Sequence, residues 1–344
     1  MMNKFVSGNN HKEEEGMAHD LLPCQTPRLP PSHPGDSSSM WTAMLLLEVM
    51  IYGSYSTLVN LSEEDGHLPY SSASVILLIE VAKFVISFCL YFGEMQRDQF
   101  QMPKLAPAAL VSYAVPAVLY AFNNNISLLM NQQMDPTTYQ VLNNMKIATT
   151  ALLYRFIIKR PIKRPQWVAI CLLMVAGVCD SYGGYDSGST PGSSSHIFIT
   201  LPGLLMMTLY CSVSGVAAVY TEYILKKQLT MSLHVQNMLL YSYGFLLNLA
   251  AFVWQRRQTG GEVRGGLLAG FSLTTLVIII TQAFNGLIMS VVMKHGSNLT
   301  RLFIISGAML VSTLSSVLFL GTTINAYFLL AAFIVSGAVY LYHQ

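Results

Sequence analysis

The fold of this chain is decided by the stretch Met134-Asp135-Pro136-Thr137-Thr138-Tyr139-Gln140-Val141-Leu142-Asn143-Asn144-Met145-Lys146. Proline is favoured in the first turn of a helix, and an aspartate before it can accept hydrogen bonds from the free N–H groups of that turn. A helix that starts at Pro136 places Tyr139, Asn143, Lys146 and Thr150 on one face. The segment that follows is apolar to Ile158, so the lysine must face a bundle interior or an aqueous cavity. This predicts a substrate-binding role for the lysine, with a structural ion pair as the alternative.

The composition around this stretch is that of a membrane protein. Of 344 residues, 53% are hydrophobic and 10% are charged, and the mean hydropathy is +0.47. Soluble domains carry about 25% charged residues. A spanning helix needs about 20 mostly apolar residues, and windows of this kind predict ten transmembrane helices in an all-α fold. They lie near residues 40–60, 71–93, 106–131, 137–158, 166–183, 198–224, 233–254, 268–293, 302–320 and 324–342.

The basic residues between these spans predict the orientation. The loop at 159–165 holds four Lys or Arg residues, whereas the loops at 61–70 and 184–197 hold none. The positive-inside rule then places both termini in the cytosol. Arg256, Arg257 and Arg264 are the exception, because they lie in a loop that this orientation places on the lumenal side. Residues 1–39 mix glutamate, proline and serine and predict a disordered cytosolic tail. No nucleic-acid partner is expected, because the basic residues lie in short loops.

The spans group into two sets of five, at 40–183 and 198–344, with a lumenal linker at 184–197. Lys146 and Arg301 each stand just inside a span, after a polar run and before small residues. Because five is odd, two such halves would insert in opposite orientations. Inverted repeats with a binding site between them are typical of secondary transporters. The pattern therefore predicts two inverted five-helix repeats.

Other spans carry polar stripes that favour a shared polar interior. Glu80 and Lys83 stand three apart in the second span and can form an ion pair that braces the helices. The seventh span carries Asn237 and Tyr241 on one face. Tyr210 shares a face with small residues and is assigned to helix packing. Cations attract phosphate, amides read base and sugar edges, and aromatic rings stack on bases. This inventory suits a small anion that carries a ring, such as a nucleotide.

The sequence lacks the patterns of catalysis and of metal or cofactor binding. It has no glycine-rich phosphate loop and no cluster of His or Cys. Its five cysteines are scattered without metal or redox spacing, so no cofactor and no metal site are expected. Glu48 has no basic neighbour in the sequence, which leaves a proton-coupling site or a protonated acid as interpretations. The chain is therefore not expected to be an enzyme.

Several motifs in this order and spacing resemble the nucleotide-sugar transporters of solute carrier family 35, subfamily A. They are Glu80-Val81-Ala82-Lys83, Asn124-Asn125, Tyr139-Gln140-Val141 with Lys146, Gly215 to Tyr220 with Glu222, Asn237 with Tyr241, and Ser290-Val291-Val292-Met293-Lys294. The resemblance implies ten spans, a Golgi membrane, and exchange of a cytosolic nucleotide sugar for a lumenal nucleoside monophosphate. It implies pocket positions for Asn124, Asn125, Tyr139, Lys146, Asn237, Tyr241 and Lys294.

The chain departs from this family after Lys294. His295, Gly296 and Ser297 stand where an aromatic and an acid are usual, and Arg301-Leu302 replaces Lys-Gly. The substrate expected is a pyrimidine nucleotide sugar, UDP-, CMP- or CDP-linked, with a sugar alcohol as one option. The alternative is a non-transporting scaffold or regulator of related nucleotide-sugar transporters. Related transporters or a second copy of the chain are the protein partners expected. The predicted substrate-binding residues are Lys83, Asn124, Asn125, Tyr139, Asn143, Lys146, Asn237, Tyr241, Asn285, Lys294 and Arg301.

Overall fold

The structure is a computed structural model, and all of the regular secondary structure in its described residues is helical. It describes residues 36–63, 68–98, 107–130, 136–159, 161–188, 200–228, 231–258, 266–320 and 326–342. Most of the predicted N-terminal tail and much of the predicted linker therefore lie outside the described residues. The division into two five-helix halves stays a prediction.

Eleven helices are present in the described residues, and each lies on a predicted span. They are α2 (Asp36–Leu61), α3 (Ser72–Asp98), α4 (Pro107–Met130), α5 (Pro136–Asn143), α6 (Met145–Ile157), α7 (Arg164–Gly188), α8 (Leu201–Lys227), α9 (Leu233–Gln258), α10 (Leu273–His295), α11 (Asn298–Leu320) and α12 (Ala326–Tyr342).

The apolar length of these helices fits a multi-pass membrane protein. Six helices in the described part of the chain are long and apolar enough to cross a bilayer, namely α2, α3, α8, α9, α10 and α11. Part of α4, Leu110–Asn123, and the whole of α12, Ala326–Tyr342, are shorter apolar helices. The count of ten spans in inverted repeats is not established by these lengths and stays a prediction.

The fourth predicted span is broken, which corrects the prediction of one continuous helix. Pro136 begins α5 as expected, but α5 ends at Asn143 and α6 begins at Met145. Asn144 lies between them and donates from Nδ2 to Val141 O and to Ser181 Oγ of α7, both at 3.3 Å. An asparagine that bonds to nearby backbone competes with the helical ladder. The break therefore has a side-chain cause that the periodicity alone did not reveal.

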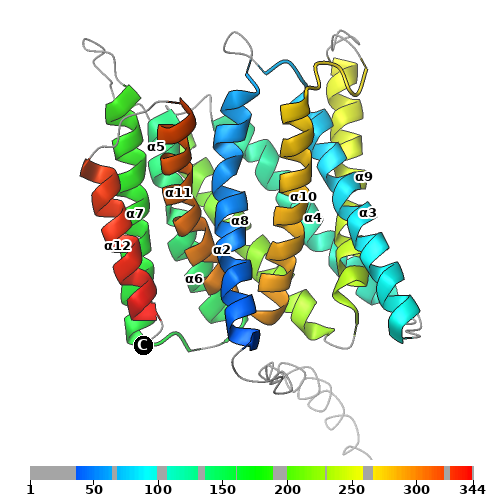
Figure 1. Cartoon of the computed structure of the whole chain (residues 1–344), viewed down its shortest axis with the longest axis horizontal. Helices are drawn as coiled ribbons and strands as arrows, with labels where there is room; N and C mark the ends of the chain where they lie inside the picture. The colour runs from blue at the N-terminus through cyan, green and yellow to red at the C-terminus, as the bar shows by residue number, and fades with distance from the viewer. Residues whose placement is uncertain are drawn as a thin grey trace, which may run out of the picture.

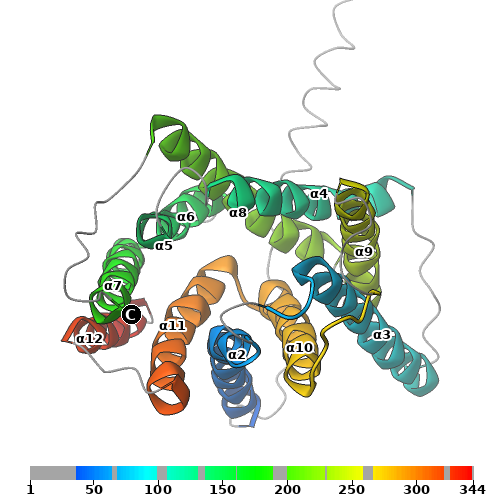
Figure 2. The same cartoon turned by 90° about the horizontal axis from the view of Figure 1, so that it is seen from above.

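The helices form two facing rows, as Figure 2 shows. One row contains α4, α6 and α8, with α4 and α6 both packed on α8. The opposite row contains α10, α2 and α11, with α2 between its two neighbours. The pairs α7 with α12 and α3 with α9 lie at the two ends of the rows. In Figure 1 the start of α2 and the end of α12 lie at the same end of the bundle.

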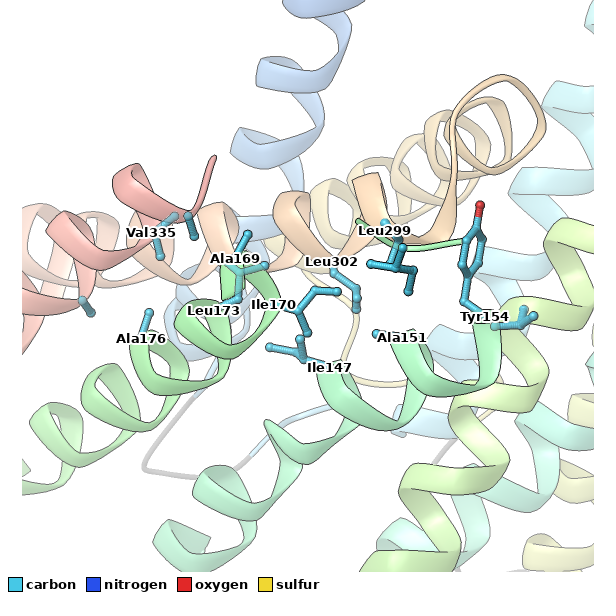
Figure 3. Packing of buried hydrophobic residues seen from close by; sticks show 14 residues of the cluster. Ile147, Ala151, Tyr154, Ala169, Ile170, Leu173, Ala176, Leu299, Leu302 and Val335 are labelled. Atoms are coloured by element: carbon cyan, nitrogen blue, oxygen red, sulfur yellow. The ribbon is translucent and has the colours of Figure 1, made fainter. Parts of the chain in front are cut away.

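A buried apolar cluster joins the two rows at one end, and a close backbone contact joins α2 to α11 within one row. A buried cluster joins α6, α7, α11 and α12 through side chains such as Ile147, Ile170, Leu302 and Val335 (Figure 3). At the crossing of α2 and α11, a Cβ on Gly53 would lie 2.6 Å from the carbonyl oxygen of Ala308. Only glycine lets the two backbones approach this closely. These contacts leave the polar positions of α6 and α11 between the two rows.

Candidate functional site

A cavity of about 310 Å³ lies between α6 and α11, and it contains two cationic side chains. We name it the α6–α11 cavity. Lys146 of α6 and Arg301 of α11 line it from opposite rows, together with the predicted Asn143. Its other lining residues are Tyr52, Asn144, Ile147, Thr150, Ser181, Ser214, Ala218, Asn298, Leu302, Ile305 and Met309. Ligand pockets in proteins range from about 300 to 1,000 Å³, so a small ligand or part of a larger one fits here.

The side chain of Lys146 is held by an aromatic residue of α8. Its Nζ donates to the hydroxyl of Tyr210 at 2.5 Å and lies 4.0 Å from the centre of that ring. Tyr139 of α5 donates to the same hydroxyl at 3.3 Å. Both salt bridges in the described part of the chain involve other lysines. The structural ion pair considered for Lys146 is therefore absent among the described residues, and its charge is available to an anion in the cavity.

Arg301 faces the cavity from the first turn of α11. The turn is fixed by Ser297, whose Oγ accepts the N–H of Thr300 and whose carbonyl accepts the N–H of Arg301. The Nε of Arg301 has no hydrogen-bond partner among the described residues, and neither carboxylate oxygen of the fully buried Glu48 has one. Glu48 lies within electrostatic range of Arg301. A half-buried guanidinium with an unused donor can bind a phosphate or carboxylate.

A second cavity of about 300 Å³ lies between α3, α4 and α9, and we name it the α3–α9 cavity. Lys83 lines it, pairs with Glu80 at 2.5 Å, and lies 4.6 Å from the ring centre of Tyr241. Gly286 of α10 makes room for the lysine, because a Cβ there would lie 2.6 Å from its Cδ. The Tyr241 hydroxyl donates to the Gly286 carbonyl at 3.1 Å. The cavity therefore presents an ion pair and an aromatic ring side by side.

The two cavities are neighbours. Tyr120 of α4 lines the α3–α9 cavity and interacts with Arg301, which lines the α6–α11 cavity. The α6–α11 cavity holds two cations without a paired acid among its described lining residues, whereas the α3–α9 cavity holds the Glu80–Lys83 ion pair and the ring of Tyr241. A nucleotide has phosphates at one end and a flat base at the other. The arrangement can therefore receive the two chemically different ends of one ligand.

Four of the predicted binding residues with described side chains lie outside the lining of both cavities, namely Tyr139, Asn237, Lys294 and Asn285. Tyr139 bonds to Tyr210. Asn237 of α9 donates to Ser290 Oγ at 2.8 Å and holds α9 against α10. Lys294 donates to the carbonyl of Met231 at 2.8 Å, between the start of α9 and the end of α10. The remaining one, Asn285, donates to Gln282 on its own helix at 3.1 Å. In this conformation these side chains bond to protein groups, and their binding role stays a prediction.

Two further predicted residues, Asn124 and Asn125, belong to α4, but their side chains lie outside the described residues. No group of three or more His, Cys, Asp or Glu side chains that could hold a metal is present in the described part of the chain.

Sequence reasoning missed two aromatic residues of the site. Tyr210 was assigned to helix packing because of its small neighbours, yet its hydroxyl holds Lys146. It does pack as well, against Ile126 and Met207. Tyr120 was not predicted, although it precedes Asn124 by four residues and so shares its helix face. That spacing is the signal that could have found it.

Comparison with known proteins agrees with this architecture. The sequence profile of the family described as nucleotide-sugar transporter matches residues 37–343. The probable UDP-sugar transporter proteins SLC35A4 of Danio rerio, Xenopus tropicalis and Homo sapiens are 44%, 42% and 39% identical. Each alignment covers 88% of this chain and 92–94% of the relative. A solved structure described only as a crystal structure of a protein has a TM-score of 0.63 at 10% identity, over 88% of this chain and 96% of the other. The last likeness shows the fold alone.

The helical fold and its buried cationic cavity define a multi-pass membrane protein of the transporter class. The chain belongs to the nucleotide-sugar transporter family. The resemblance inferred from its motifs is thereby confirmed. Proteins of this kind are transporters rather than enzymes, in agreement with the absence of a catalytic pattern in the sequence.

Proposed function

We propose that this chain is a Golgi antiporter that moves a pyrimidine nucleotide sugar into the lumen and returns a nucleoside monophosphate to the cytosol. A UDP-linked sugar is the first candidate, because the relatives are named as probable UDP-sugar transporters. CMP- and CDP-linked sugars or sugar alcohols share the same phosphate and ring chemistry. Both termini are cytosolic in this proposal, as the alternation of basic loops indicates.

The observation that carries the proposal is the convergence of Lys146 and Arg301 on one cavity. They come from helices in opposite rows, and each is half-buried in a part of the chain with few charges. Burying two like charges is costly unless an anion compensates them. The phosphate groups of a nucleotide supply that compensation through charge-assisted hydrogen bonds. We assign the phosphate contacts to these two residues.

The neighbouring α3–α9 cavity suits the base. Tyr241 offers a ring on which a base can stack, and Lys83 with Glu80 offers donors and acceptors at the ring edge. Asn143 lines the α6–α11 cavity, and its Oδ1 is buried without a partner among the described residues. We assign it to a hydroxyl of the ribose or of the sugar. Tyr139 acts through Tyr210 by holding Lys146 in place.

Obligatory exchange follows from the same charges. In an empty cavity Lys146 and Arg301 repel each other in a medium of low dielectric constant, and Glu48 near Arg301 reduces this repulsion only when its carboxyl is ionised. Any bound phosphate relieves this repulsion, whether it belongs to the nucleotide sugar or to the monophosphate. The loaded protein should therefore convert between its two open states more readily than the empty one. Rocking of two helix groups around a fixed site is the usual mode of inverted-repeat transporters.

The scaffold alternative is less well supported. A protein that only binds related transporters, or a second copy of itself, has no need for a cationic cavity between its helix rows. The cavity residues include buried polar atoms without partners among the described residues, such as Asn143 Oδ1 and Arg301 Nε. Such atoms are costly to bury and are usually kept where a ligand satisfies them.

Uptake into proteoliposomes tests the proposal. Vesicles containing the purified chain are loaded with UMP, CMP, AMP or buffer and then given labelled UDP-, CMP- and CDP-linked substrates. We expect uptake of at least one conjugate, accelerated by the matching pyrimidine monophosphate and not by AMP. Equal uptake into empty and loaded vesicles would indicate a uniporter. If no conjugate is taken up while the chain binds a related transporter, the scaffold is favoured instead.

A further inference from the structure

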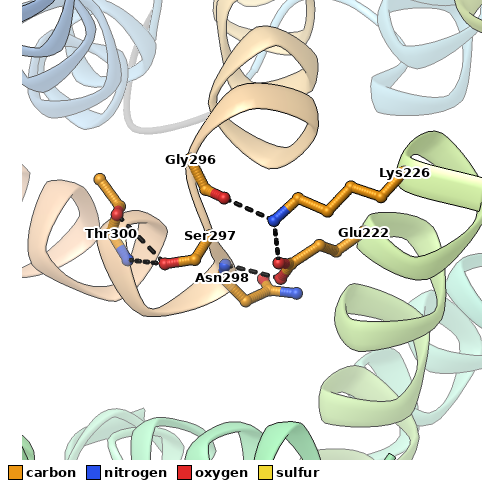
Figure 4. A network of polar contacts seen from close by, with 6 residues as sticks. All are labelled: Glu222, Lys226, Gly296, Ser297, Asn298 and Thr300. Carbon is orange, nitrogen blue, oxygen red and sulfur yellow. Dashed lines mark hydrogen bonds and ion pairs between the residues drawn. The ribbon is translucent and has the colours of Figure 1, made fainter. Parts of the chain in front are cut away.

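A buried ion pair of α8 forms hydrogen bonds to the backbone of the connection between α10 and α11 (Figure 4). Glu222 is fully buried, and its Oε1 accepts a 2.5 Å bond from the Nζ of Lys226. Its other oxygen accepts the backbone N–H of Asn298, the first residue of α11, at 2.7 Å. Lys226 also donates to the carbonyl of Gly296 at 2.5 Å. The pair thus holds one N–H and one C=O of the same short connection.

These bonds join helices of the two rows, which also meet in an apolar cluster where Leu225 of α8 is buried with Met293 of α10 and Ile304 of α11. α8 packs mainly on α4 and α6, whereas α10 and α11 pack on α2. The α6–α11 cavity lies between these groups, with Ser214 and Ala218 of α8 on one side and Arg301 on the other. Figure 2 shows α8 in one row and α10 and α11 in the facing row. Glu222 and Lys226 therefore connect the two walls of the cavity.

The connection between α10 and α11 lies directly beside the α6–α11 cavity. Asn298 lines the cavity, and Arg301 follows it by one helical turn on the same face. Lys226 is itself 7% exposed and is not among the described residues that line either cavity. Its charge is already used by Glu222 and Gly296. A role in binding substrate is therefore not what buries this lysine.

We propose that Glu222 and Lys226 form a latch that closes one end of the α6–α11 cavity and opens during transport. Opening breaks the bonds to Gly296 and Asn298, separates α8 from the α10–α11 connection, and admits solutes to Arg301. Opening also separates Leu225 from Met293 and Ile304, so this apolar contact adds to the stability that the hydrogen bonds give to the closed state. The latch lies at the end of α8 that the basic loops place in the cytosol, so it would be the cytosolic gate. The inference rests on the proposed transport function.

The labelling rate of a cysteine in the cavity measures how readily the latch opens, and it needs no substrate. In a background that lacks the five native cysteines, Ser214→Cys places a thiol on the cavity wall. A membrane-impermeant methanethiosulfonate is added to proteoliposomes whose N-terminal tags face outward. Lys226→Met removes both donated bonds and should raise the labelling rate about tenfold, which corresponds to about 1.4 kcal/mol in the closing equilibrium. Glu222→Gln keeps an acceptor and should raise the rate less.

Lys227→Met is the matched control, because Lys227 is the next residue along α8 and is exposed. It should leave the labelling rate unchanged. Equal rates for Lys226→Met, Lys227→Met and the parent would overturn the latch. If Lys226→Met does not give monodisperse protein, Glu222→Gln decides alone, and a parental rate would refute the proposal. Faster labelling together with no uptake by the parent would support the latch and reject the nucleotide-sugar substrate.

Discussion

Replacing Lys146 by methionine should weaken binding of nucleotide phosphates while leaving the protein folded. Methionine keeps a long unbranched stem of similar size, so the packing beside Tyr210 is largely retained. The lost interaction is one charge-assisted hydrogen bond, worth about 1.5–3 kcal/mol. At about 1.4 kcal/mol per factor of ten, affinity should fall about 10- to 150-fold. The substitution loses the hydrogen bond and ring contact to Tyr210 but also removes the cost of desolvating a cation, so the unfolding temperature should change little.

Competition binding in detergent and exchange in proteoliposomes give the affinity and the transport rate. Lys227→Met serves as the control, since it removes an exposed lysine that lines neither cavity in the described part of the chain. Tyr210→Phe is the intermediate case, because it keeps the ring near Lys146 and deletes only the hydroxyl that accepts its bond. That variant should weaken binding by about 0.5–1.5 kcal/mol, the usual worth of one hydrogen bond.

Two results would refute this reasoning. Parental affinity in Lys146→Met would remove Lys146 from the phosphate site. A large fall in the unfolding temperature, with binding lost only in proportion to unfolded protein, would show that the lysine is structural. Equal losses for a nucleotide sugar and for the nucleoside monophosphate are expected, because both present phosphate to the same charge.

Three further predictions follow from the packing and the orientation. Gly286→Ala should weaken ligand binding in the competition assay, since its Cβ would lie 2.6 Å from Lys83 Cδ and displace that side chain; parental affinity would show that the lysine can move at no cost. Gly177→Ala should lower the unfolding temperature by an amount equivalent to about 1–3 kcal/mol, because its Cβ would overlap Asn144 Oδ1. Gly337→Ala, with open space around its Cβ, is the control for both. Tags at the two chain ends should be reached by antibody after permeabilisation of the plasma membrane alone; a tag that needs the Golgi membrane opened would contradict the orientation.

Helix positions were predictable because apolar length and hydropathy are local properties. A run of about 20 apolar residues must satisfy its backbone internally in a bilayer, and only a helix does so within one segment. The first helical residue at Pro136 followed from the same local chemistry. The break after Asn143 did not follow, because it depends on Ser181 and Gly177 of α7, more than 30 residues away. The helical periodicity of the sequence around Asn143 carries no information about partners on another helix.

The type of site, a polar cavity with cations, was predictable from the sequence, but only some of the residues that line it were. A lysine in an apolar segment indicates a polar interior, because placing its charge in lipid costs free energy. This cost alone identified Lys146 and Lys83. Lys294 and Asn237 carry the same signal, yet each bonds to a protein group between α9 and α10. Whether a buried polar group faces a cavity or a neighbouring helix depends on rotation about the helix axis. That rotation is fixed by packing against other helices.

The sequence by itself determined the helical class, the positions of the apolar segments and the presence of buried charges, because each depends on the free energy of single segments in lipid. The tertiary structure alone decided which charges meet. It brought Lys146 and Arg301 to one cavity although 155 positions separate them in the sequence. It also tied Glu222 to the backbone of Asn298. These contacts depend on how α6 and α8 are placed relative to α11. That placement arises from packing over the whole bundle and leaves no local pattern in the chain.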